Sequence, residues 1–370
     1  MESTSIVSKS HFLQNKRVLV TGGAGFIGGT LVRELITLGE CKVFNLDKLS
    51  YSSDLFSIYI LEKNNPDLFK DRYQFFKADL NNFSEIKEVM KIANPDLIFH
   101  LAAESHVDRS IDGPRPFVMS NIVGTFNLLE AALMHYQNLK ASRKSNFRFL
   151  HISTDEVFGS LGEDGFFSED SRYDPRSPYS ASKASSDHLV RAWHHTYNLP
   201  TLITNCSNNF GPWQFPEKLI PLVINKAVSE KNIPIYGTGK NIRDWLYVDD
   251  HVNALLKVIN QGIPGKTYCI GSNNEKTNLE IAQLICDNLD KIIPLNYSRR
   301  KLIKFVEDRP GHDKRYAINS SFINSNLSWK ASYDFNESLE KTVKWYINNK
   351  NWCEKVMKKS NYKGERIGQK

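Results

Sequence analysis

Near the N-terminus the chain reads Arg17-Val18-Leu19-Val20-Thr21-Gly22-Gly23-Ala24-Gly25-Phe26-Ile27-Gly28, and this segment carries the strongest indication of its fold. The first five residues form a short apolar run that predicts a β-strand. The glycines allow a tight turn, and apolar residues then recur at helical spacing, at Phe26, Ile27, Leu31, Val32, Leu35 and Leu38. A strand, a glycine turn and a helix in this order form a dinucleotide-binding fingerprint, because backbone N–H groups at the helix N-terminus attract a pyrophosphate.

A second predicted strand, Lys42 to Leu46, ends in Asp47, nineteen residues beyond Gly28. An acidic side chain at this point binds both hydroxyls of a ribose and repels a 2′-phosphate, so NAD is expected rather than NADP. Lys48 beside it counts against that preference. The alternative interpretation is a glycine-rich surface turn, but the strand, the helix and the downstream acid together favour nucleotide binding.

Length and composition agree with an α/β protein that has a sizeable core. The chain has 370 residues, of which 41% are hydrophobic, enough for one large domain with an appended lobe or for two domains. Its 48 basic and 41 acidic residues leave a net charge of +7, which suits an anionic small molecule. The basic run at 299–301 and the lysine-rich tail lack interleaved aromatic residues, so no nucleic-acid partner is expected.

The cysteines and the chain ends bear on compartment and metal binding. Five widely separated cysteines without a Cys-x-x-Cys pair favour a reducing compartment and argue against a disulfide framework or a thiolate zinc site. No His-Glu-x-x-His motif occurs, so no metal is expected. The first sixteen residues are polar, and no apolar run approaches the length of a membrane span. We therefore expect a cytoplasmic protein with no membrane partner and with flexible ends at 1–14 and 358–370.

Predicted strands and helices alternate along most of the chain, which is the pattern of a doubly wound parallel sheet. Further strands are expected at 73–77, 97–100, 147–153 and 202–206, and helices at 84–93, 116–135 and around Tyr179. The alternation weakens where prolines crowd between 212 and 234. We predict a Rossmann-type α/β fold with two parts. They are an NAD-binding domain of residues 15–205 and 243–270, and a smaller C-terminal α/β substrate lobe of residues 206–242 and 271–355.

Ligands of such sheets bind at the carboxyl ends of the strands, near the point where the strand order reverses. Four polar segments follow predicted strands, namely Asp79, His100 to Ser105, Ser153 to Glu156 and Cys206 to Asn209. Taken singly, each is typical of a polar strand end that faces water. Together with the fingerprint they predict a single cleft.

Tyr179-x-x-x-Lys183 lies in a stretch with helical character, so the two side chains share one face of a helix. A nearby ammonium favours the phenolate, and such a tyrosine can take the proton of a sugar hydroxyl while hydride moves to a nicotinamide. Asp155 and Glu156 add an acid and a base. Because neighbours in a strand point to opposite faces, the backbone has to leave the strand at or before Asp155. The alternative is an acidic strand end that leads into a solvated loop.

From about Lys16 to Asn348 the chain resembles the extended short-chain dehydrogenase/reductase superfamily of nucleotide-sugar enzymes, and within it the dTDP-glucose 4,6-dehydratases. The superfamily marks are Thr21 to Gly28, Tyr179 and Lys183. The more specific segments are Leu101 to Ser110, Ser153 to Gly159, Asn205 to Pro212, Arg243 to Val248 and Asp308 to His312. Phe158 and Phe210 stand where the family often has tyrosine, which puts substrate detail in doubt rather than the reaction.

The resemblance implies a hydro-lyase that uses its own NAD. Such an enzyme oxidises carbon 4 of dTDP-glucose, eliminates water across carbons 5 and 6, and returns the hydride to carbon 6, so that the product is dTDP-4-keto-6-deoxyglucose. The product would supply rhamnose-type deoxysugar biosynthesis. Tyr179 would take the proton of the 4-hydroxyl, with Thr154 orienting that hydroxyl and Lys183 holding the nicotinamide ribose. Glu156 would remove the carbon 5 proton, and Asp155 would protonate the departing 6-hydroxyl.

The resemblance also implies the binding residues. For the cofactor they are Gly22, Gly25, Phe26, Ile27, Gly28, Asp47, Lys48, Asp79, Leu80, Ala102, Ala103, Ser120, Tyr179, Lys183 and Asn209. For the nucleotide sugar they are Ser105, Thr154, Asn208, Lys218, Leu219, Arg243, Asn278, Arg309 and His312. The two arginines are placed on the pyrophosphate, where a planar fork matches phosphate oxygens.

Two other classes of function stay open at this point. One is a different enzyme on the same scaffold, such as a UDP-sugar 4-epimerase, a decarboxylase or a UDP-glucose 4,6-dehydratase. The other is an NAD-binding protein without catalysis, since a fold alone does not secure a function. Analogy with the fold further suggests a homodimer packed through helices at about Phe117 to His135 and Tyr179 to Tyr197. The nucleotide preference, thymidine or uridine, is left undecided by the sequence.

Overall fold

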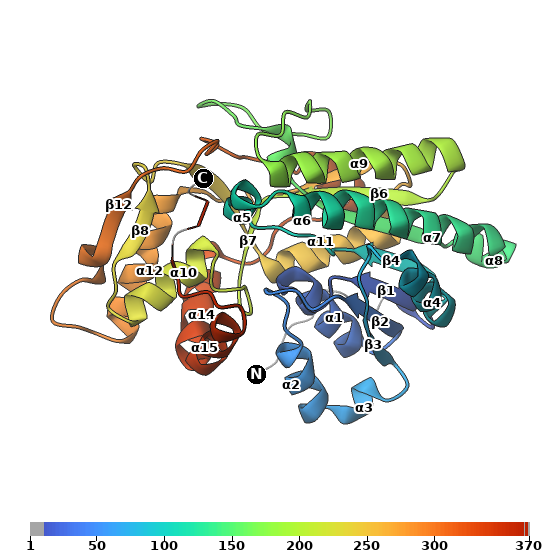
Figure 1. Ribbon diagram of the computed structural model, residues 1–370, viewed down its shortest axis with the longest axis horizontal. Coiled ribbons are helices and arrows are strands. Elements are labelled where there is room, and N and C mark those ends of the chain that lie inside the picture. The colour runs from blue at the N-terminus through green and yellow to red at the C-terminus, as the bar shows by residue number, and fades with distance from the viewer. Residues whose placement is uncertain (1–10, 366, 369–370) are drawn as a thin grey trace.

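The computed structural model describes residues 11–365, 367 and 368. Within them, a parallel sheet of seven strands forms the centre, in the order β10-β6-β5-β4-β1-β2-β3 (Figure 1). The strands of this sheet are β1 Arg17–Thr21, β2 Lys42–Asp47, β3 Tyr73–Lys77, β4 Leu97–His100, β5 Arg148–Thr154, β6 Thr201–Cys206 and β10 Thr267–Ile270. The order runs outward in both directions from β1 and β4, which is the doubly wound arrangement. The predicted Rossmann-type fold class is confirmed.

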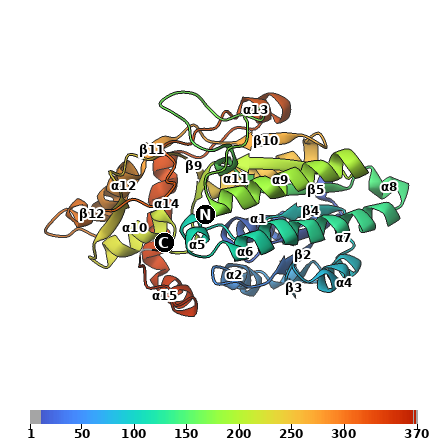
Figure 2. The same ribbon diagram turned by 45° about the horizontal axis from the view of Figure 1, so that its top comes forward.

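Helices cover both faces of this sheet (Figures 1 and 2). One face packs against α1 and α11, and the other against α4, α7 and α9. Their bounds are α1 Phe26–Leu38, α4 Phe83–Ala93, α7 Gly124–Asn138, α9 Pro178–Tyr197 and α11 Val248–Gln261. Each face buries its own apolar cluster, so the strands, apolar on both sides, lie between two layers of core.

The long helix predicted at 116–135 is divided in three. It consists of α6 Arg115–Phe117, a π-helical turn η2 Val118–Val123, and α7. Within the π turn, the Asn121 amide donates to the Glu104 carbonyl at 2.9 Å and to Ser182 Oγ at 2.8 Å. These contacts tie the wider turn to the loop after β4 and to α9, the elements that carry functional motifs.

This same helix, Arg115–Asn138, is long and apolar enough to span a membrane by length and composition alone, although no such run was expected from the sequence. Half of its most apolar window is buried inside the protein, where the helix packs against α4 and α9. That burial is typical of the core helix of a globular fold.

The C-terminal half adds a second body with smaller sheets. A three-stranded sheet has the order β11-β9-β7, and a two-stranded sheet pairs β12 with β8. The strands are β7 Asn208–Phe210, β8 Ile233–Tyr236, β9 Ile242–Tyr247, β11 Glu275–Thr277 and β12 Ile303–Val306. They share an apolar cluster with α10 Leu219–Val228, α12 Asn278–Ile292, α14 Phe335–Asn348 and α15 Lys350–Lys359. Short helices complete the chain: α2 Phe56–Asn64, α3 Pro66–Phe69, α5 Val107–Asp112, α8 Ala141–Lys144 and α13 Ser321–Leu327.

Several contacts cross the domain boundaries that we predict from the sequence. Strand β9 pairs with β7 and β11 of the smaller body, although most of it falls in the range 243–270 assigned to the first domain. Ile323, Leu327 and Trp329 pack in the cluster of α1 and α11, although they fall in the range assigned to the lobe. The division into 15–205 with 243–270 and 206–242 with 271–355 therefore stays a prediction.

The expectation of flexible ends at 1–14 and 358–370 stays a prediction, although two of the described residues in these ranges are buried. Leu13 is 4% exposed and packs on the main core, and Tyr362 is 4% exposed and packs in the smaller one. Apolar burial of this kind holds a chain end in place. Residues 1–10, 366, 369 and 370, which belong to the same predicted ends, lie outside the described residues.

The glycine turn gives a test of the fold with a neighbouring control. A Cβ added at Gly28 would lie 2.2 Å from the Gly22 carbonyl oxygen, whereas one added at Gly29 would meet nothing closer than 3.5 Å. We expect Gly28→Ala to lower the free energy of unfolding by about 2 kcal/mol or more, because backbone has to shift. Gly29→Ala should change it by less than about 1 kcal/mol, and toward stability, since alanine favours a helix interior.

Urea unfolding of the two variants checks this expectation. A Gly28→Ala protein as stable as wild type would contradict the close approach of the turn to the start of α1.

Candidate active site

The carboxyl ends of the parallel strands open into one pocket. Its walls come from the glycine turn after β1, the ends of β2 and β3, the loop after β4, the end of β5, one face of α9, the segment after β6, and the segment 214–218 of the smaller body. The pocket therefore lies where the strand order reverses, which is where open α/β sheets bind ligands. The cleft predicted from the four polar strand ends is present.

The glycine turn brings backbone close to backbone at the floor of this pocket. Gly22 has a φ of +74°, and a Cβ there would lie 2.6 Å from the Ala102 nitrogen. The N-cap of α1 is Gly25, which offers no side-chain hydrogen bond to the first turn. N–H groups of that turn thus remain available for an anion, so the turn suits a pyrophosphate.

Asp47, at the end of β2, is held by the backbone around it. Its two carboxylate oxygens accept from the Ala24 N–H at 3.1 Å and from the Leu49 N–H at 2.7 Å. Burial raises the pKa of Asp47, and these two hydrogen bonds oppose the shift. A carboxylate fixed in this way keeps lone pairs for ribose hydroxyls.

Lys48, the residue after Asp47, forms an ion pair. Its Nζ lies 2.9 Å from a carboxylate oxygen of Glu104, which follows β4. The cation that counted against a preference for NAD is therefore already paired, and it offers little to a 2′-phosphate.

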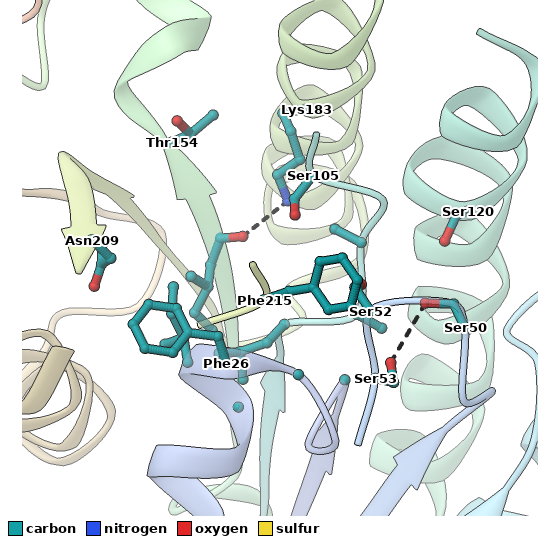
Figure 3. A pocket seen from close by; sticks show the side chains of 18 of the residues that line it. Phe26, Ser50, Ser52, Ser53, Ser105, Ser120, Thr154, Lys183, Asn209 and Phe215 are labelled. Atoms are coloured by element: carbon teal, nitrogen blue, oxygen red, sulfur yellow. Dashed lines mark hydrogen bonds between the residues drawn. The ribbon is translucent and has the colours of Figure 1, made fainter. Parts of the chain in front are cut away.

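All the residues predicted to contact a cofactor line this one pocket. They are Gly22, Gly25, Phe26, Ile27, Gly28, Asp47, Lys48, Asp79, Leu80, Ala102, Ala103, Ser120, Tyr179, Lys183 and Asn209. Figure 3 shows Phe26 and Ser120 on two sides of the space, with Lys183 and Asn209 on the others. The close-packed turn, the fixed acid and the shared lining together fit a bound dinucleotide.

Strand β5 ends at Thr154, and the 3-10 turn η3 Asp155–Phe158 begins at once. The expectation that the backbone leaves the strand at or before Asp155 is confirmed. Thr154 caps the turn, because its Oγ1 accepts from the Glu156 N–H at 3.3 Å. The same hydroxyl lies 3.2 Å from Asp155 Oδ1, to which it donates. The turn lets both acids line the pocket.

The two acids have different electrostatic surroundings. Asp155 is 1% exposed, and its Oδ2 has no hydrogen-bond partner within the described chain. Burial and the neighbouring Glu156 raise the pKa of Asp155 well above its ordinary value. Burial also raises the pKa of Glu156, but the cations Arg309, Lys218 and Arg243 oppose it. The geometry thus favours a protonated Asp155 beside an ionised Glu156.

Tyr179 and Lys183 lie on one face of α9 and both line the pocket, as their spacing predicts. Lys183 Nζ donates to the Ile152 carbonyl at 2.9 Å, the bond dashed beside Lys183 in Figure 3. Burial lowers the pKa of Lys183 to about 8. The pKa of Tyr179 is raised well above its usual value by burial and then by Glu156, while a hydrogen bond with Thr154 opposes the rise. Lys183 was predicted to make proton loss from Tyr179 easier, but this effect does not outweigh the effect of burial on the Tyr179 pKa.

The residues predicted to hold the nucleotide sugar divide into two groups. Ser105, Thr154, Asn208 and Lys218 line the pocket, and Lys218 Nζ donates to the Ser105 carbonyl at 2.7 Å. The others lie outside its lining: Leu219 at the start of α10, Asn278 at the start of α12, Arg243 on β9, and Arg309 and His312 after β12.

The two arginines nevertheless lie close enough to Glu156 to affect its pKa. Arg243 is 5% exposed and donates to the carbonyls of Ile242 at 2.7 Å and Asp313 at 3.0 Å, with its guanidinium over the ring of Tyr316. Arg309 pairs with Asp108, and its Nε has no partner among the described residues. Positive charge is thus gathered on the lobe side of the pocket.

Part of the pocket lining was not predicted from the sequence. It includes Ser50, Ser52, Ser53, Gln214, Phe215 and Glu217. The serines directly follow β2, so the strand-end rule would have found them. Gln214 to Glu217 come from a segment without a motif, and only long-range contacts such as Tyr51 Oη to Glu217 Oε1, 2.7 Å, bring them here. Among the described residues no cluster of three or more His, Cys, Asp or Glu side chains could hold a metal ion.

The raised pKa of Asp155 predicts a pH-dependent stability. Between the ordinary aspartate pKa and the raised one, the folded protein binds a proton that the unfolded chain has lost, so this group destabilises the fold as pH rises. Asp155→Asn removes the titration. The variant should gain at least about 1 kcal/mol in unfolding free energy relative to wild type between pH 5 and pH 8.

Urea titrations of both proteins at the two pH values measure this difference, and groups that titrate alike in both cancel. A difference that stays constant with pH would show that Asp155 ionises normally in the folded protein.

Comparisons with known proteins agree with this geometry. The family model of GDP-mannose 4,6 dehydratase matches residues 19–342. A dTDP-glucose 4,6-dehydratase of Escherichia coli is 50% identical over 365 residues, covering 95% of this chain and 99% of the relative. The crystal structure of the dTDP-glucose 4,6-dehydratase DesIV from Streptomyces venezuelae, with NAD bound, has a TM-score of 0.83 at 37% identity and covers 92% of this chain and 99% of that one.

A dTDP-glucose 4,6-dehydratase from Bacillus anthracis, solved in complex with NAD, has a TM-score of 0.80 at 39% identity and covers 93% of this chain and 99% of that one. The resemblance stated from the motifs is therefore confirmed over nearly the whole length. The chain belongs to the dTDP-glucose 4,6-dehydratase family.

Proposed function

We propose that this protein is an NAD-dependent hydro-lyase that converts dTDP-glucose to dTDP-4-keto-6-deoxyglucose. One observation carries the proposal. A buried acid whose pKa is raised and a second acid surrounded by cations lie next to Tyr179 in the same pocket. Hydride transfer alone would need neither carboxyl, whereas elimination of water needs a proton donor and a proton acceptor.

The order of steps follows from the chemistry of the sugar. The carbon 5 proton is barely acidic until carbon 4 is a ketone, so oxidation has to come first. Bound NAD supplies the hydride acceptor for carbon 4 and later the hydride donor for carbon 6. Tyr179 takes the proton of the 4-hydroxyl, and Thr154, which lines the same pocket, orients that hydroxyl. The ammonium of Lys183, on the same helix face, favours the phenolate.

Elimination then uses the two acids. Glu156 accepts the carbon 5 proton and returns it to carbon 5 when the hydride reaches carbon 6, and the cations around it stabilise its carboxylate before the first of these steps. Asp155 gives its proton to the 6-hydroxyl, which leaves as water. Because burial and Glu156 raise the pKa of Asp155 well above its ordinary value, Asp155 is the acid that suits proton donation.

The pocket also suits the charged part of the substrate. Lys218, Arg243 and Arg309 supply the positive charge on the lobe side, and the guanidinium groups match phosphate oxygens geometrically. We propose that Ser105, Asn208, Leu219, Asn278 and His312 complete the nucleotide-sugar site. Asp47 with the paired Lys48 favours NAD over NADP.

The alternatives make different demands on the same scaffold. A UDP-sugar 4-epimerase needs the tyrosine and NAD but has no water to eliminate, so the pair of acids counts against it. A UDP-glucose 4,6-dehydratase would use the same chemistry on another nucleotide. A decarboxylase, or an NAD-binding protein without catalysis, would leave Asp155 and Glu156 unexplained.

The test compares two nucleotide sugars as substrates, and the wild-type protein with a variant of Asp155. Purified protein is incubated with dTDP-glucose or UDP-glucose without added NADH, and the 4-keto-6-deoxy product is followed by its absorbance in alkali. We expect product from dTDP-glucose, and at least a 100-fold lower rate for Asp155→Asn, because general acid catalysis contributes about that much. Asp164→Asn, at an exposed acid outside the pocket, is the matched control and should keep the wild-type rate.

Product from UDP-glucose alone would show the same reaction with a uridine nucleotide as the preferred substrate. No product from either sugar, or an Asp155→Asn protein at full rate, would overturn the proposal.

We further propose a homodimer that packs through the helix Arg115–Asn138 and α9. Large apolar side chains are exposed along these helices, with Val118 44%, Phe126 42%, Met134 49% and Tyr197 47% exposed. Exposed apolar side chains on neighbouring helices are typical of a helix-to-helix interface. The five cysteines are free and buried, which supports a cytoplasmic location, and a 4-keto-6-deoxy product suits rhamnose-type deoxysugar biosynthesis.

Sedimentation tests the interface. The double substitution Val118→Glu and Met134→Glu should turn a dimer into a monomer, because four carboxylates would face one another across the twofold axis. Phe305→Glu, at a side chain 58% exposed on β12 of the smaller body, is the control and should stay dimeric. A wild-type protein that sediments as a monomer would contradict the assignment.

A further inference from the structure

A buried polar network lies behind Lys183, on the side away from the pocket lining. Its centre is Asp187, one helical turn further along α9 and 0% exposed. One carboxylate oxygen, Oδ2, accepts from Ser153 Oγ at 2.9 Å, Tyr173 Oη at 2.8 Å and Asn205 Nδ2 at 3.2 Å. Three donors on one oxygen favour the ionised form, so a buried carboxylate persists here.

The other oxygen leads back to Lys183. Asp187 Oδ1 lies 3.2 Å from His151 Nε2, and that nitrogen lies 3.4 Å from Lys183 Nζ. His151 Nδ1 is buried without a partner in the described chain. His151 Nε2 has its hydrogen-bond partner in Ser186 Oγ at 3.2 Å, and Asp187 Oδ1 has none in the described chain, so the carboxylate acts on its surroundings by charge. His151 therefore lies between the acid and the lysine.

We infer that Asp187 is a positioning residue for Lys183: across the His151 ring it holds a buried negative charge near the Lys183 ammonium and keeps that lysine protonated in the pocket. The inference rests on the role proposed above for Lys183. The reaction scheme assigns Asp187 no proton transfer, and it does not line the pocket.

The other titratable groups around Lys183 lie on several neighbouring elements, and they leave Asp187 as the main charge that acts on it. The His100 ring on β4 lies beside that of His151 at a tilt of 37°, and burial keeps the pKa of both imidazoles below the ordinary value, so neither carries a competing charge. Cys206 on β6 is a thiol whose pKa burial raises, and Arg191 is turned to Tyr173 Oη at 2.8 Å. Burial lowers the pKa of Lys183, and Asp187 is the first group that opposes the lowering.

The consequence is a defined dependence on pH. Burial brings the pKa of Lys183 to about 8 while Asp187 is charged. Without that charge the pKa falls further, so the ammonium is lost at lower pH. Contacts that need the ammonium are intact below the lysine pKa and weaken as pH rises through it. NAD binding is such a contact if Lys183 holds the ribose.

The experiment measures the dissociation constant of NAD by calorimetry from pH 6 to 9.5, a readout independent of turnover. Wild type should bind more weakly as pH rises through about 8. In Asp187→Asn, which keeps the shape and removes the charge, the midpoint should fall by roughly one pH unit, with binding about fivefold weaker at pH 8, about tenfold weaker at pH 9 and nearly unchanged at pH 6. Asp187→Ser is the second neutral variant, should the asparagine protein not fold.

Two controls separate charge from packing. Tyr173→Phe removes one hydrogen bond to Asp187 without removing its charge, and should keep the wild-type midpoint. In a Lys183→Arg background, whose guanidinium stays charged, adding Asp187→Asn should no longer move any midpoint. An Asp187→Asn protein with a lower melting temperature and an unshifted midpoint would overturn the inference. An absence of dehydration in wild type would overturn the proposed function instead, and the midpoint of NAD binding would still report on Asp187.

Discussion

Strand β5 ends at Thr154, and much of the site depends on that boundary. Two consecutive side chains of an extended strand point to opposite faces, so Asp155 and Glu156 could not both serve one pocket if β5 continued. The Thr154 hydroxyl stabilises the exit, since it accepts from the Glu156 N–H as a helix cap does. The turn leaves Asp155 deeply buried and places Glu156 near the cations of the smaller body.

Burial then assigns the ionisation states. Desolvation disfavours charge, and it is the largest influence on the pKa of Asp155, Glu156, Tyr179 and Lys183 alike. These groups differ in the charged neighbours that shift their pKa values. Glu156 raises the pKa of Asp155 further, three cations lower that of Glu156, and Asp187 raises that of Lys183. Acid, base and ammonium can therefore coexist in one pocket because each has a different charged neighbour.

The local features of this arrangement were predictable from the sequence, and the long-range ones were not. The strand and helix periods, the glycine turn and the spacing of Tyr179 and Lys183 are properties of short segments, and they predicted the main sheet and the cofactor side of the pocket. Pairing of β9 with β7 and β11 joins segments far apart in the chain, so no local pattern indicated it. Tyr362 and Gln214 to Glu217 reach their places by tertiary packing for the same reason. The raised pKa of Tyr179 likewise depends on burial, which residue spacing does not show.

The central claim is that oxidation, elimination and reduction occur on one sugar without an external reductant. The most direct measurement follows a deuterium placed on carbon 4 of dTDP-glucose. Mass spectrometry and NMR of the product should find that deuterium on carbon 6 of the same molecule, with no added NADH. Deuterium that remains on carbon 4, or that is lost to solvent or to added cofactor, would contradict the account.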